Sequence, residues 1–378
     1  MVDKERIVVR GLERVIAGET RISDVDGFNG ELFYSGYNIH ELAGKISYEE
    51  TIYLLWYNRL PNASEFSELR AKLISEMRLP SQIVEMMKLI PPNSHPMAVL
   101  RSIVSTLGLF DPDSEEITEA ANRRKAIRIL AQIPTIIADL HRLRKNKPVL
   151  SPDPGIGFAA NFLYMLRGTL PDKEESNAID LIMMLHADHG FNASTFTARV
   201  TASTLSDLHS AITSAIGSLK GPLHGGASQR VMEMLNQIDS IDEVEAYIEG
   251  MLNEKKRIMG FGHRVYKTED PRAAHLRRIA RHLCQRREQN KFYKIANKIE
   301  HTVKKEKGIY PNVDFYSAIA QHTLGIPKEY FTAVFAASRT AGWLAHIFEQ
   351  YADNRLIRPT SKYTGKYNEK FVPIDKRK

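Results

Sequence analysis

The most apolar stretch of the chain is Phe331-Thr-Ala-Val-Phe-Ala-Ala-Ser-Arg339-Thr-Ala-Gly-Trp-Leu-Ala-His346-Ile-Phe348. An uninterrupted apolar stretch of about eighteen residues could cross a membrane, but Arg339 and His346 interrupt this one, so we predict a buried helix instead. A buried guanidinium is costly unless it is paired, and no acidic residue lies within one helical turn of Arg339. Its partner is therefore either a bound dicarboxylate or a carboxylate from elsewhere in the fold.

Helical patterns recur through the rest of the chain. Ser47 with Glu50 and Asn62 with Glu65 are spaced as capping boxes, and each pair precedes apolar residues three and four positions apart. We expect successive helices to be separated at prolines, namely Pro80, Pro91, Pro92, Pro96, Pro134 and Pro148.

Strand signals are confined to one place near the start of the chain. Residues 20–26 and 31–37 flank a glycine-containing turn at 27–30, which predicts a small hairpin. Strands do not alternate with helices anywhere, so a Rossmann-type sheet is excluded. The sequence therefore predicts an all-α protein with a small N-terminal β-hairpin.

Two glycine-containing breaks, at residues 217–226 and 325–327, divide the helical pattern. The 378 residues also exceed the roughly 250 to 300 residues that one core usually reaches. We therefore predict a large helical domain from residues 1–225 and 326–378, with a smaller inserted helical domain at 226–325. The motifs described below lie near the edges of the insertion, so we expect the active site in a cleft between two moving parts.

Composition excludes several classes of protein. Lys and Arg exceed Asp and Glu by a formal charge of +7, but the basic residues are mixed with acidic ones, so we expect small polyanionic substrates and no nucleic acid. The single cysteine, Cys284, excludes an intrachain disulfide and a cysteine-built zinc site and indicates a reducing compartment. Charged residues throughout positions 1–16 rule out a signal peptide, so we expect a cytoplasmic protein that binds no membrane.

The first candidate site motif is Lys220-Gly-Pro-Leu-His224-Gly-Gly-Ala227. Its glycines and Pro222 place His224 on a tight turn at a helix start, where the backbone can approach a ligand closely. A helix N-terminus favours neutral imidazole, which can donate a hydrogen bond to a developing enolate. The alternative is a turn residue that caps the helix. Esterase oxyanion loops contain a similar His-Gly-Gly, but this chain has no Gly-x-Ser-x-Gly to complete such a site.

The second motif is Met259-Gly-Phe-Gly-His263-Arg-Val-Tyr-Lys267, followed by Asp270-Pro-Arg272. Its glycines give a loop whose backbone amides can meet phosphates or a thioester chain, and nearby basic residues add positive charge. His263 and Arg272 offer a proton donor and a carboxylate clamp side by side. The alternative is a surface loop with solvated charges.

The third motif is Pro311-Asn-Val-Asp314-Phe-Tyr-Ser317. Apolar and aromatic neighbours would desolvate Asp314 and raise its pKa toward that of a useful base. Asp314 is also a candidate N-cap for the helix that follows, and one residue can have both roles.

The fourth motif is Leu185-His186-Ala-Asp188-His189-Gly-Phe-Asn-Ala-Ser-Thr195. His186 and His189 lie one helical turn apart with Asp188 nearby, which permits a metal site, but the spacing differs from that of zincins. Histidines at the end of an apolar helix can equally bind a substrate carboxylate or satisfy backbone carbonyls. We expect no metal here.

In this order and spacing, the four motifs and the arginine-containing helix resemble citrate synthases, particularly the short, dimeric bacterial and archaeal kind. The likeness extends from Gly11-Leu-Glu13 and Tyr34-Ser-Gly-Tyr37, through Tyr53-Leu-Leu-Trp56 and His95-Pro-Met97, to Val372-Pro-Ile374. It covers nearly the whole chain. The resemblance implies an acyltransferase of the tricarboxylic acid cycle that joins acetyl-CoA to oxaloacetate, with water, to give citrate and CoA.

The resemblance also implies a role for each catalytic position. Asp314 would remove a proton from the methyl group of acetyl-CoA, while His224 donates a hydrogen bond to the thioester oxygen. His263 would polarise and protonate the ketone of oxaloacetate, and water would then hydrolyse citryl-CoA. The family needs no metal and no cofactor besides the coenzyme A thioester.

The same resemblance implies the residues that bind each substrate, and it implies a homodimer. Oxaloacetate would be bound by His189, His224, His263, Arg272, Arg339 and Arg358. Coenzyme A would be bound by Lys256, Arg257, Ile258, Met259, Gly260 and Lys267. Arg358 would enter the active site of the second subunit, and oxaloacetate binding would close the small domain.

Three positions depart from the family pattern. Gly190 stands where an acidic residue is common, Ser35 where a basic one is common, and Thr360 where a second arginine is common. They bear on oxaloacetate binding and leave the three catalytic positions intact. Two alternatives stay open: a 2-methylcitrate synthase that uses propionyl-CoA, since one methylene is worth only about 1 to 3 kcal/mol of discrimination, and a catalytically silent homologue that binds the same ligands.

Overall fold

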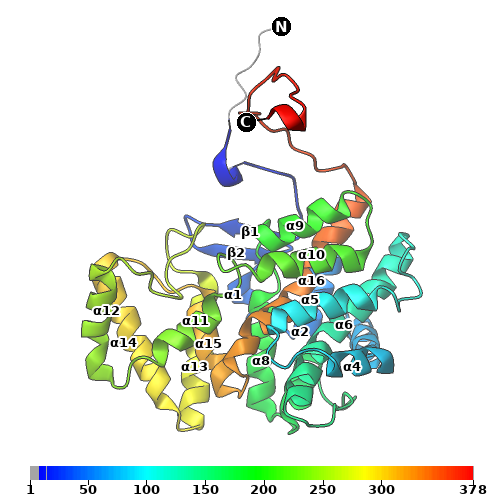
Figure 1. The fold of residues 1–378 in the computed structure, drawn as a ribbon. Coiled ribbons are helices and arrows are strands. Elements are labelled where there is room, and N and C mark those ends of the chain that lie inside the picture. Colours follow the sequence, from blue (N-terminus) through cyan, green and yellow to red (C-terminus); the bar gives the residue numbers. More distant parts are fainter. Residues whose placement is uncertain (1–7, 14, 378) are drawn as a thin grey trace.

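Helix α16 (Phe331–Ala352) runs through the centre of the molecule in this computed structural model, which describes residues 8–13 and 15–377 (Figure 1). Every residue from 331 to 347 is buried, including Arg339 and His346. Two hydroxyl side chains of the helix donate to carbonyl oxygens four positions earlier, at 2.8 Å each. The stretch is therefore the buried helix that the sequence predicts.

The described residues form sixteen α-helices and one three-stranded antiparallel sheet, which confirms the all-α class. The helices besides α16 are α1 (Ile39–Leu42), α2 (Tyr48–Tyr57), α3 (Ala63–Ser75), α4 (Ser81–Lys88), α5 (Pro96–Leu107), α6 (Glu119–Arg144), α7 (Phe158–Arg167), α8 (Lys173–His186), α9 (Ala193–Ala202), α10 (Leu208–Leu219), α11 (Ala227–Leu235), α12 (Val244–Asn253), α13 (Pro271–Arg286), α14 (Asn290–Lys307) and α15 (Val313–Thr323).

Both predicted capping boxes are present. The side chains of Ser47 and Asn62 accept hydrogen bonds from the first turns of α2 and α3, and Glu50 and Glu65 reach back to the cap residues. Each box satisfies backbone N–H groups that a helix start would otherwise leave unpaired.

One proline prediction is wrong, because Pro134 lies inside α6 instead of between helices. A proline in a helix removes one backbone hydrogen bond and strains the preceding turn. However, every residue of α6 from 129 to 142 is buried. Tertiary packing of this long helix outweighs the local cost, and the sequence pattern alone did not reveal that packing. Pro96, by contrast, begins α5 as predicted.

Strands β1 (Ser23–Asp26) and β2 (Glu31–Tyr34) form the predicted hairpin, shorter than predicted, and β3 (Tyr37–Asn38) pairs with β2. The hairpin turn packs against the loop that contains His263. Lys267 donates its backbone N–H to the carbonyl oxygen of Gly27 at 2.8 Å, and a Cβ atom on Gly27 would lie 2.4 Å from the carbonyl oxygen of Val265. Glycine is therefore needed at this contact.

Helices α11 to α15 gather at one side of the molecule (Figure 1), with α13 packed on α15 and α12 on α14. They fall within the segment 226–325 for which we predict an inserted domain, and the division into two moving domains stays a prediction. In the part of the chain that the structure describes, no helix is both long and apolar enough to cross a membrane. The charged stretch at positions 1–16 lies partly outside the described residues.

Candidate active site

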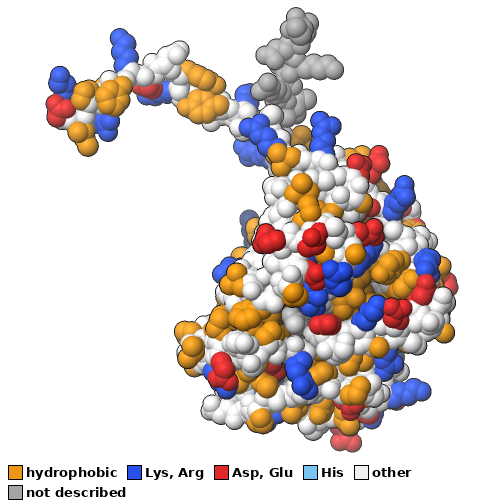
Figure 2. Space-filling view, turned by 90° about the vertical axis from the view of Figure 1, so that its right-hand side faces the viewer, with side chains coloured by type: hydrophobic (Ala, Val, Ile, Leu, Met, Phe, Trp, Pro, Cys, Tyr) orange, Lys and Arg blue, Asp and Glu red, His pale blue; other side chains and the backbone are white. Residues whose placement is uncertain are grey.

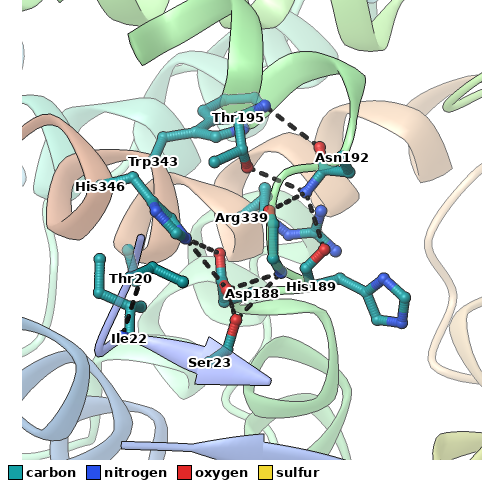
Figure 3. Close-up of polar contacts among 12 residues, drawn as sticks. Thr20, Ile22, Ser23, Asp188, His189, Asn192, Thr195, Arg339, Trp343 and His346 are labelled. Atoms are coloured by element: carbon teal, nitrogen blue, oxygen red, sulfur yellow. Dashed lines mark hydrogen bonds and ion pairs between the residues drawn. The ribbon is translucent and has the colours of Figure 1, made fainter. Parts of the chain in front are cut away.

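Asp188 follows α8 and is buried between β1 and α16 (Figure 3). The Ser23 hydroxyl donates to its carboxylate, and Nε2 of His346 lies 3.3 Å from Asp188 Oδ2. Helix α16 and the backbone after α8 approach closely because Gly342 of α16 has no side chain. A Cβ at this position would lie 2.4 Å from the carbonyl oxygen of Ala187. Burial alone would raise the pKa of Asp188, but His346 and Arg339 hold it below its usual range. Asp188 is therefore ionised.

Arg339 is 1% exposed, and its Nε donates to the carbonyl oxygen of His186 at 2.7 Å. Burial lowers the pKa of this guanidinium to about 10, while Asp188 acts in the opposite direction. Asp188 is therefore a carboxylate from elsewhere in the fold whose charge acts on Arg339, but the two side chains form no ion pair. Among the described residues, however, only Nε of the guanidinium has a hydrogen-bond partner. The two terminal nitrogens therefore have bonding capacity for a ligand.

Three aromatic rings lie together beside Arg272. His189 Nε2 is 3.1 Å from the Tyr266 hydroxyl, and the ring centroids of His189 and His263 are 5.2 Å apart. Figure 3 shows the His189 ring pointing away from Asp188. Burial, followed by Arg272, lowers the pKa of His189 well below its ordinary value, so the ring is neutral. The structure thus joins two predicted oxaloacetate residues from distant parts of the sequence.

His263 has a defined tautomer. Its Nδ1 accepts the backbone N–H groups of Val265 at 3.0 Å and Tyr266 at 3.2 Å. Burial and Arg272 lower the pKa of His263 to about 4. A neutral ring that accepts at Nδ1 carries its proton on Nε2. His263 is therefore a neutral hydrogen-bond donor.

Arg272 is buried in a two-point ion pair with Asp270. Its Nε and Nη2 donate to the two carboxylate oxygens at 2.9 and 2.8 Å, and Asp270 also caps α13. Although burial acts in the opposite direction, Asp270 raises the pKa of Arg272. Two of the five guanidinium N–H donors are used in this pair, which leaves three for a substrate carboxylate.

His224 lies in the turn between α10 and α11, as predicted, and Gly226 rather than His224 takes the N-cap position of α11. Nε2 of His224 accepts the backbone N–H of Ser194 at 3.2 Å, so the proton of the neutral ring is on Nδ1. The Ser194 hydroxyl, 2.9 Å from the same nitrogen, is held by Trp343 of α16 at 3.1 Å. Burial and Arg339 lower the pKa of His224 to about 4.

Asp314 is the second residue of α15, and the prediction that it is the N-cap is wrong. Asn312 caps the helix, since its side chain accepts the backbone N–H of Asp314 at 3.0 Å. The Asp314 carboxylate is consequently free for another role, and Ser228 of α11 donates to its Oδ1. Burial raises the pKa of Asp314 to about 6, against the effects of Ser228 and Arg272. The predicted desolvation is confirmed.

The glycine loop before His263 pairs with the segment before Asp314. Gly262 donates its N–H to the carbonyl oxygen of Tyr310 at 2.9 Å, and Asn312 donates to that of Gly260 at 2.8 Å. Gly260 has a φ of 80°, and a Cβ on it would lie within 2.9 Å of Phe315. This pairing brings His263 and Asp314 to the same end of α15.

The predicted coenzyme A residues occupy different environments. Lys256, Arg257 and Met259 line a hollow of about 630 Å³ between α11 and α12. Ile258 and Gly260 are buried, whereas Lys267 is exposed and follows His263 along the loop. The structure thus places half of the set in one hollow and the other half elsewhere.

Arg358 is the predicted oxaloacetate-binding residue that the structure does not bring to the other residues of that set. It is exposed on the C-terminal segment 353–377, most of which projects from the body of the molecule (Figure 2). Of the departures from the family pattern, Gly190 has a φ of 56°, a conformation that glycine adopts without strain. Ser35 lies in the turn between β2 and β3, and Thr360 is exposed on the projecting segment.

The fourth motif is not arranged as a metal site. His186 Nδ1 lies 2.7 Å from the carbonyl oxygen of Ile182, so this ring satisfies the backbone of its own helix. Asp188 and His189 point to different partners, as described above. Across residues 8–13 and 15–377, no group of three or more His, Cys, Asp and Glu side chains is placed to hold a metal ion.

Several residues that hold this site together were not predicted: Ser194, Ser228, Tyr266, Asp270 and His346. Asp270 precedes Pro271 at a helix start, which is a recognisable capping signal. Ser194 and Ser228 have no such signal, because their partners are distant in sequence and only the fold brings them together.

Comparison with known proteins agrees with this geometry. The sequence profile described as citrate synthase, C-terminal domain, matches residues 11–360. The chain belongs to the citrate synthase family. Citrate synthase 2 of Bacillus subtilis is 49% identical over 97% of this chain and 99% of that protein. A second family member, 2-methylcitrate synthase 2 of Corynebacterium glutamicum, is 40% identical over 98% of each chain.

A solved structure of the family has the same fold. Citrate synthase of Thermoplasma acidophilum, in a ternary complex with carboxymethyl coenzyme A and oxaloacetate, superimposes with a TM-score of 0.92 at 35% identity. The match covers 98% of this chain and all of the other. The family predicted from the motifs is therefore confirmed.

Proposed function

We propose that this citrate synthase family member condenses acetyl-CoA with oxaloacetate and water to give citrate and CoA. The observation that carries the proposal is that the site combines a buried carboxylate, Asp314, with two neutral histidines. His224 carries its proton on Nδ1, and His263 carries its proton on Nε2. Asp314 has a pKa of about 6, so it is mostly ionised at neutral pH and still a stronger base than an ordinary aspartate. His224 and His263 are both neutral donors.

In the first step, Asp314 takes a proton from the acetyl methyl group, and the electron pair of the broken C–H bond forms the C=C bond of the enolate. Nδ1–H of His224 donates a hydrogen bond to the thioester oxygen, which stabilises the negative charge that develops there. In the second step, the enolate carbon attacks the ketone carbon of oxaloacetate, and the electron pair of the C=O bond moves to the ketone oxygen. Nε2–H of His263 transfers its proton to the ketone oxygen, which gives citryl-CoA. Water then cleaves the thioester to citrate and CoA.

Buried arginines suit the dianionic substrate. Arg339 has two terminal nitrogens without a hydrogen-bond partner in the described chain, and Arg272 has three N–H donors beyond its pair with Asp270. Bound carboxylates would complete both hydrogen-bonding sets. This supports oxaloacetate as the acceptor substrate, in line with the ligand named for the Thermoplasma structure.

The decisive experiment compares the rates of CoA release from acetyl-CoA and propionyl-CoA, each with oxaloacetate. We expect the higher kcat/KM with acetyl-CoA. A clear preference for propionyl-CoA would favour the second candidate, a 2-methylcitrate synthase, which the Corynebacterium relative motivates. Absence of CoA release with either thioester, despite binding of both ligands, would indicate a silent homologue.

We also propose that the enzyme is a cytoplasmic homodimer that needs no metal and no cofactor beyond the thioester. Exposed apolar side chains on the projecting C-terminal segment, including Leu356, Tyr363 and Phe371, support burial against a second chain. Activity should be unchanged after dialysis against a chelator. A loss that added Mg²⁺ or Zn²⁺ restores would contradict the metal-free mechanism.

A further inference from the structure

Tyr266 has no role in the mechanism above, yet its hydroxyl lies within the site. It is 3.1 Å from Nε2 of His189. Its ring centroid is 4.7 Å from that of His263 and 5.5 Å from that of His189. The side chain is 4% exposed. Tyr266 thus lies against two residues proposed to bind oxaloacetate.

The hydroxyl has unused hydrogen-bonding capacity. A tyrosine hydroxyl has one donor and two acceptor positions, whereas His189 is its one hydrogen-bond partner among the described side chains. If Nε2–H of His189 donates to this oxygen, the hydroxyl hydrogen is free to face the ligand. Burial raises the pKa of Tyr266. The group therefore stays protonated and brings no negative charge to a site for a dianion.

The neighbouring loop fixes the position of this hydroxyl. Backbone N–H groups of Val265 and Tyr266 hold His263, and the next residue, Lys267, donates its N–H to Gly27 of the hairpin at 2.8 Å. The Tyr266 ring is thus anchored on the same few residues that orient His263. A displacement of one would displace the other.

We propose that Tyr266 is a further oxaloacetate-binding residue: its hydroxyl holds His189 at Nε2 and donates its own hydrogen to a substrate carboxylate. The inference rests on the proposed function and adds a neutral donor to the arginines and histidines of the site. In this proposal, Tyr266 also connects His189, which follows α8, to His263 on the glycine loop.

The test uses Tyr266→Phe in the full chain, which keeps the ring and removes only the hydroxyl. Oxaloacetate binding is measured alone by titration calorimetry, and kcat and both KM values are measured in the complete reaction. A lost hydrogen bond to a charged group weakens binding by roughly tenfold or more. We therefore expect about a tenfold rise in the oxaloacetate Kd and KM, with the acetyl-CoA KM and kcat changed by less than about threefold.

The matched control is Tyr53→Phe, which removes the hydroxyl of another tyrosine outside the site, one that accepts a hydrogen bond from Arg59 at 2.8 Å. This variant should keep native kinetics. If Tyr266→Phe lowers the unfolding temperature as the control does but leaves the oxaloacetate Kd unchanged, the hydroxyl is only structural and the inference is wrong. Failure of the native chain to form citrate would instead refute the proposed function, and the calorimetric Kd would still test Tyr266.

Discussion

At the scale of single residues, burial sets the chemistry of this site. His224 and His263 would each be partly protonated near neutral pH in water, but both are partly buried near an arginine, and their pKa values fall to about 4. The same burial moves Asp314 in the opposite direction, to about 6. Desolvation disfavours the charged form of each group, so the histidines become neutral donors and the carboxylate becomes a stronger base.

The first prediction concerns this base. Asp314→Asn should lower kcat by about 10² to 10⁴-fold, because the amide cannot accept the methyl proton. Since the native carboxyl has a pKa of about 6, kcat/KM of the native enzyme should rise with pH through this value and level off above it. Steady-state CoA release across this range checks both points.

An exposed aspartate near α12 provides the control. Asp239→Asn removes a carboxylate that lies 3.8 Å from Lys291 on the protein surface, and it should leave the pH profile unchanged. Full activity of Asp314→Asn would show that another group is the base.

At the scale of elements, the site is assembled by contacts between backbone segments. The hairpin turn at 27–30 packs on the loop 265–269, the glycine loop pairs with the segment before α15, and α16 presses against the residues after α8. Each of the three contacts depends on a glycine, at positions 27, 260 and 342 respectively, because a Cβ there would overlap the facing atoms.

The second prediction follows from the hairpin contact. Gly27→Ala should destabilise the protein by about 1 to 3 kcal/mol, the usual cost of forcing extra atoms into a packed contact. It should also raise the oxaloacetate KM, since the displaced loop carries His263. Urea unfolding and steady-state kinetics measure the two effects.

Gly250→Ala on α12 is the matched control for stability. No atom lies within 4 Å of a Cβ at this position, so alanine should stabilise the helix by about 0.5 to 1 kcal/mol. Equal effects of the two substitutions would mean that the hairpin contact does not constrain the loop.

The third prediction concerns Asp139 of α6, a buried carboxyl with one oxygen that lacks a hydrogen-bond partner. Burial raises its pKa to about 7. The unfolded carboxyl loses its proton near pH 4, so between about pH 4 and pH 7 the unfolded state binds fewer protons. The free energy of unfolding should therefore fall as pH rises through this window.

Replacing Asp139 with asparagine removes this titration. Asp139→Asn should raise the free energy of unfolding at about pH 8 by about 4 kcal/mol, and by no more than about 1 kcal/mol at about pH 4.5. Urea unfolding at the two pH values gives the comparison. A variant equally stabilised at both would show that the native carboxyl is not the source of the pH dependence.

At the scale of the whole molecule, one chain leaves apolar surface uncovered. The C-terminal segment projects from the body, and both hydrophobic and basic side chains lie along it (Figure 2). Arg358 is part of this segment and lies outside the site of its own chain. A dimer in which this segment crosses to the partner would cover the apolar side chains and deliver the arginine.

The fourth prediction tests this arrangement by mixing two inactive variants, Arg358→Ala and His224→Ala, after joint unfolding and refolding. If Arg358 serves the partner's site, each mixed dimer contains one intact site, and random mixing should restore about a quarter of native activity. If Arg358 serves its own chain, no mixed site is intact and activity stays absent. Light scattering of the mixture confirms the dimer.

The sequence by itself determined the helical class, because caps and apolar spacing are local and the structure reproduces both predicted capping boxes. It also placed His224 on a turn and Asp314 near a helix start, since glycine, proline and asparagine act on neighbouring residues. Together, ordered motifs were enough to identify the family.

Only the tertiary structure decided how those residues work. It showed that Asn312 rather than Asp314 caps α15, that the charge of Asp188 acts on Arg339, and that Ser194 sets the tautomer of His224. It also showed that Pro134 lies inside a helix, because packing along α6 outweighs the loss of one backbone hydrogen bond. Each outcome depends on contacts between distant segments and on their burial, and no local pattern carries that information.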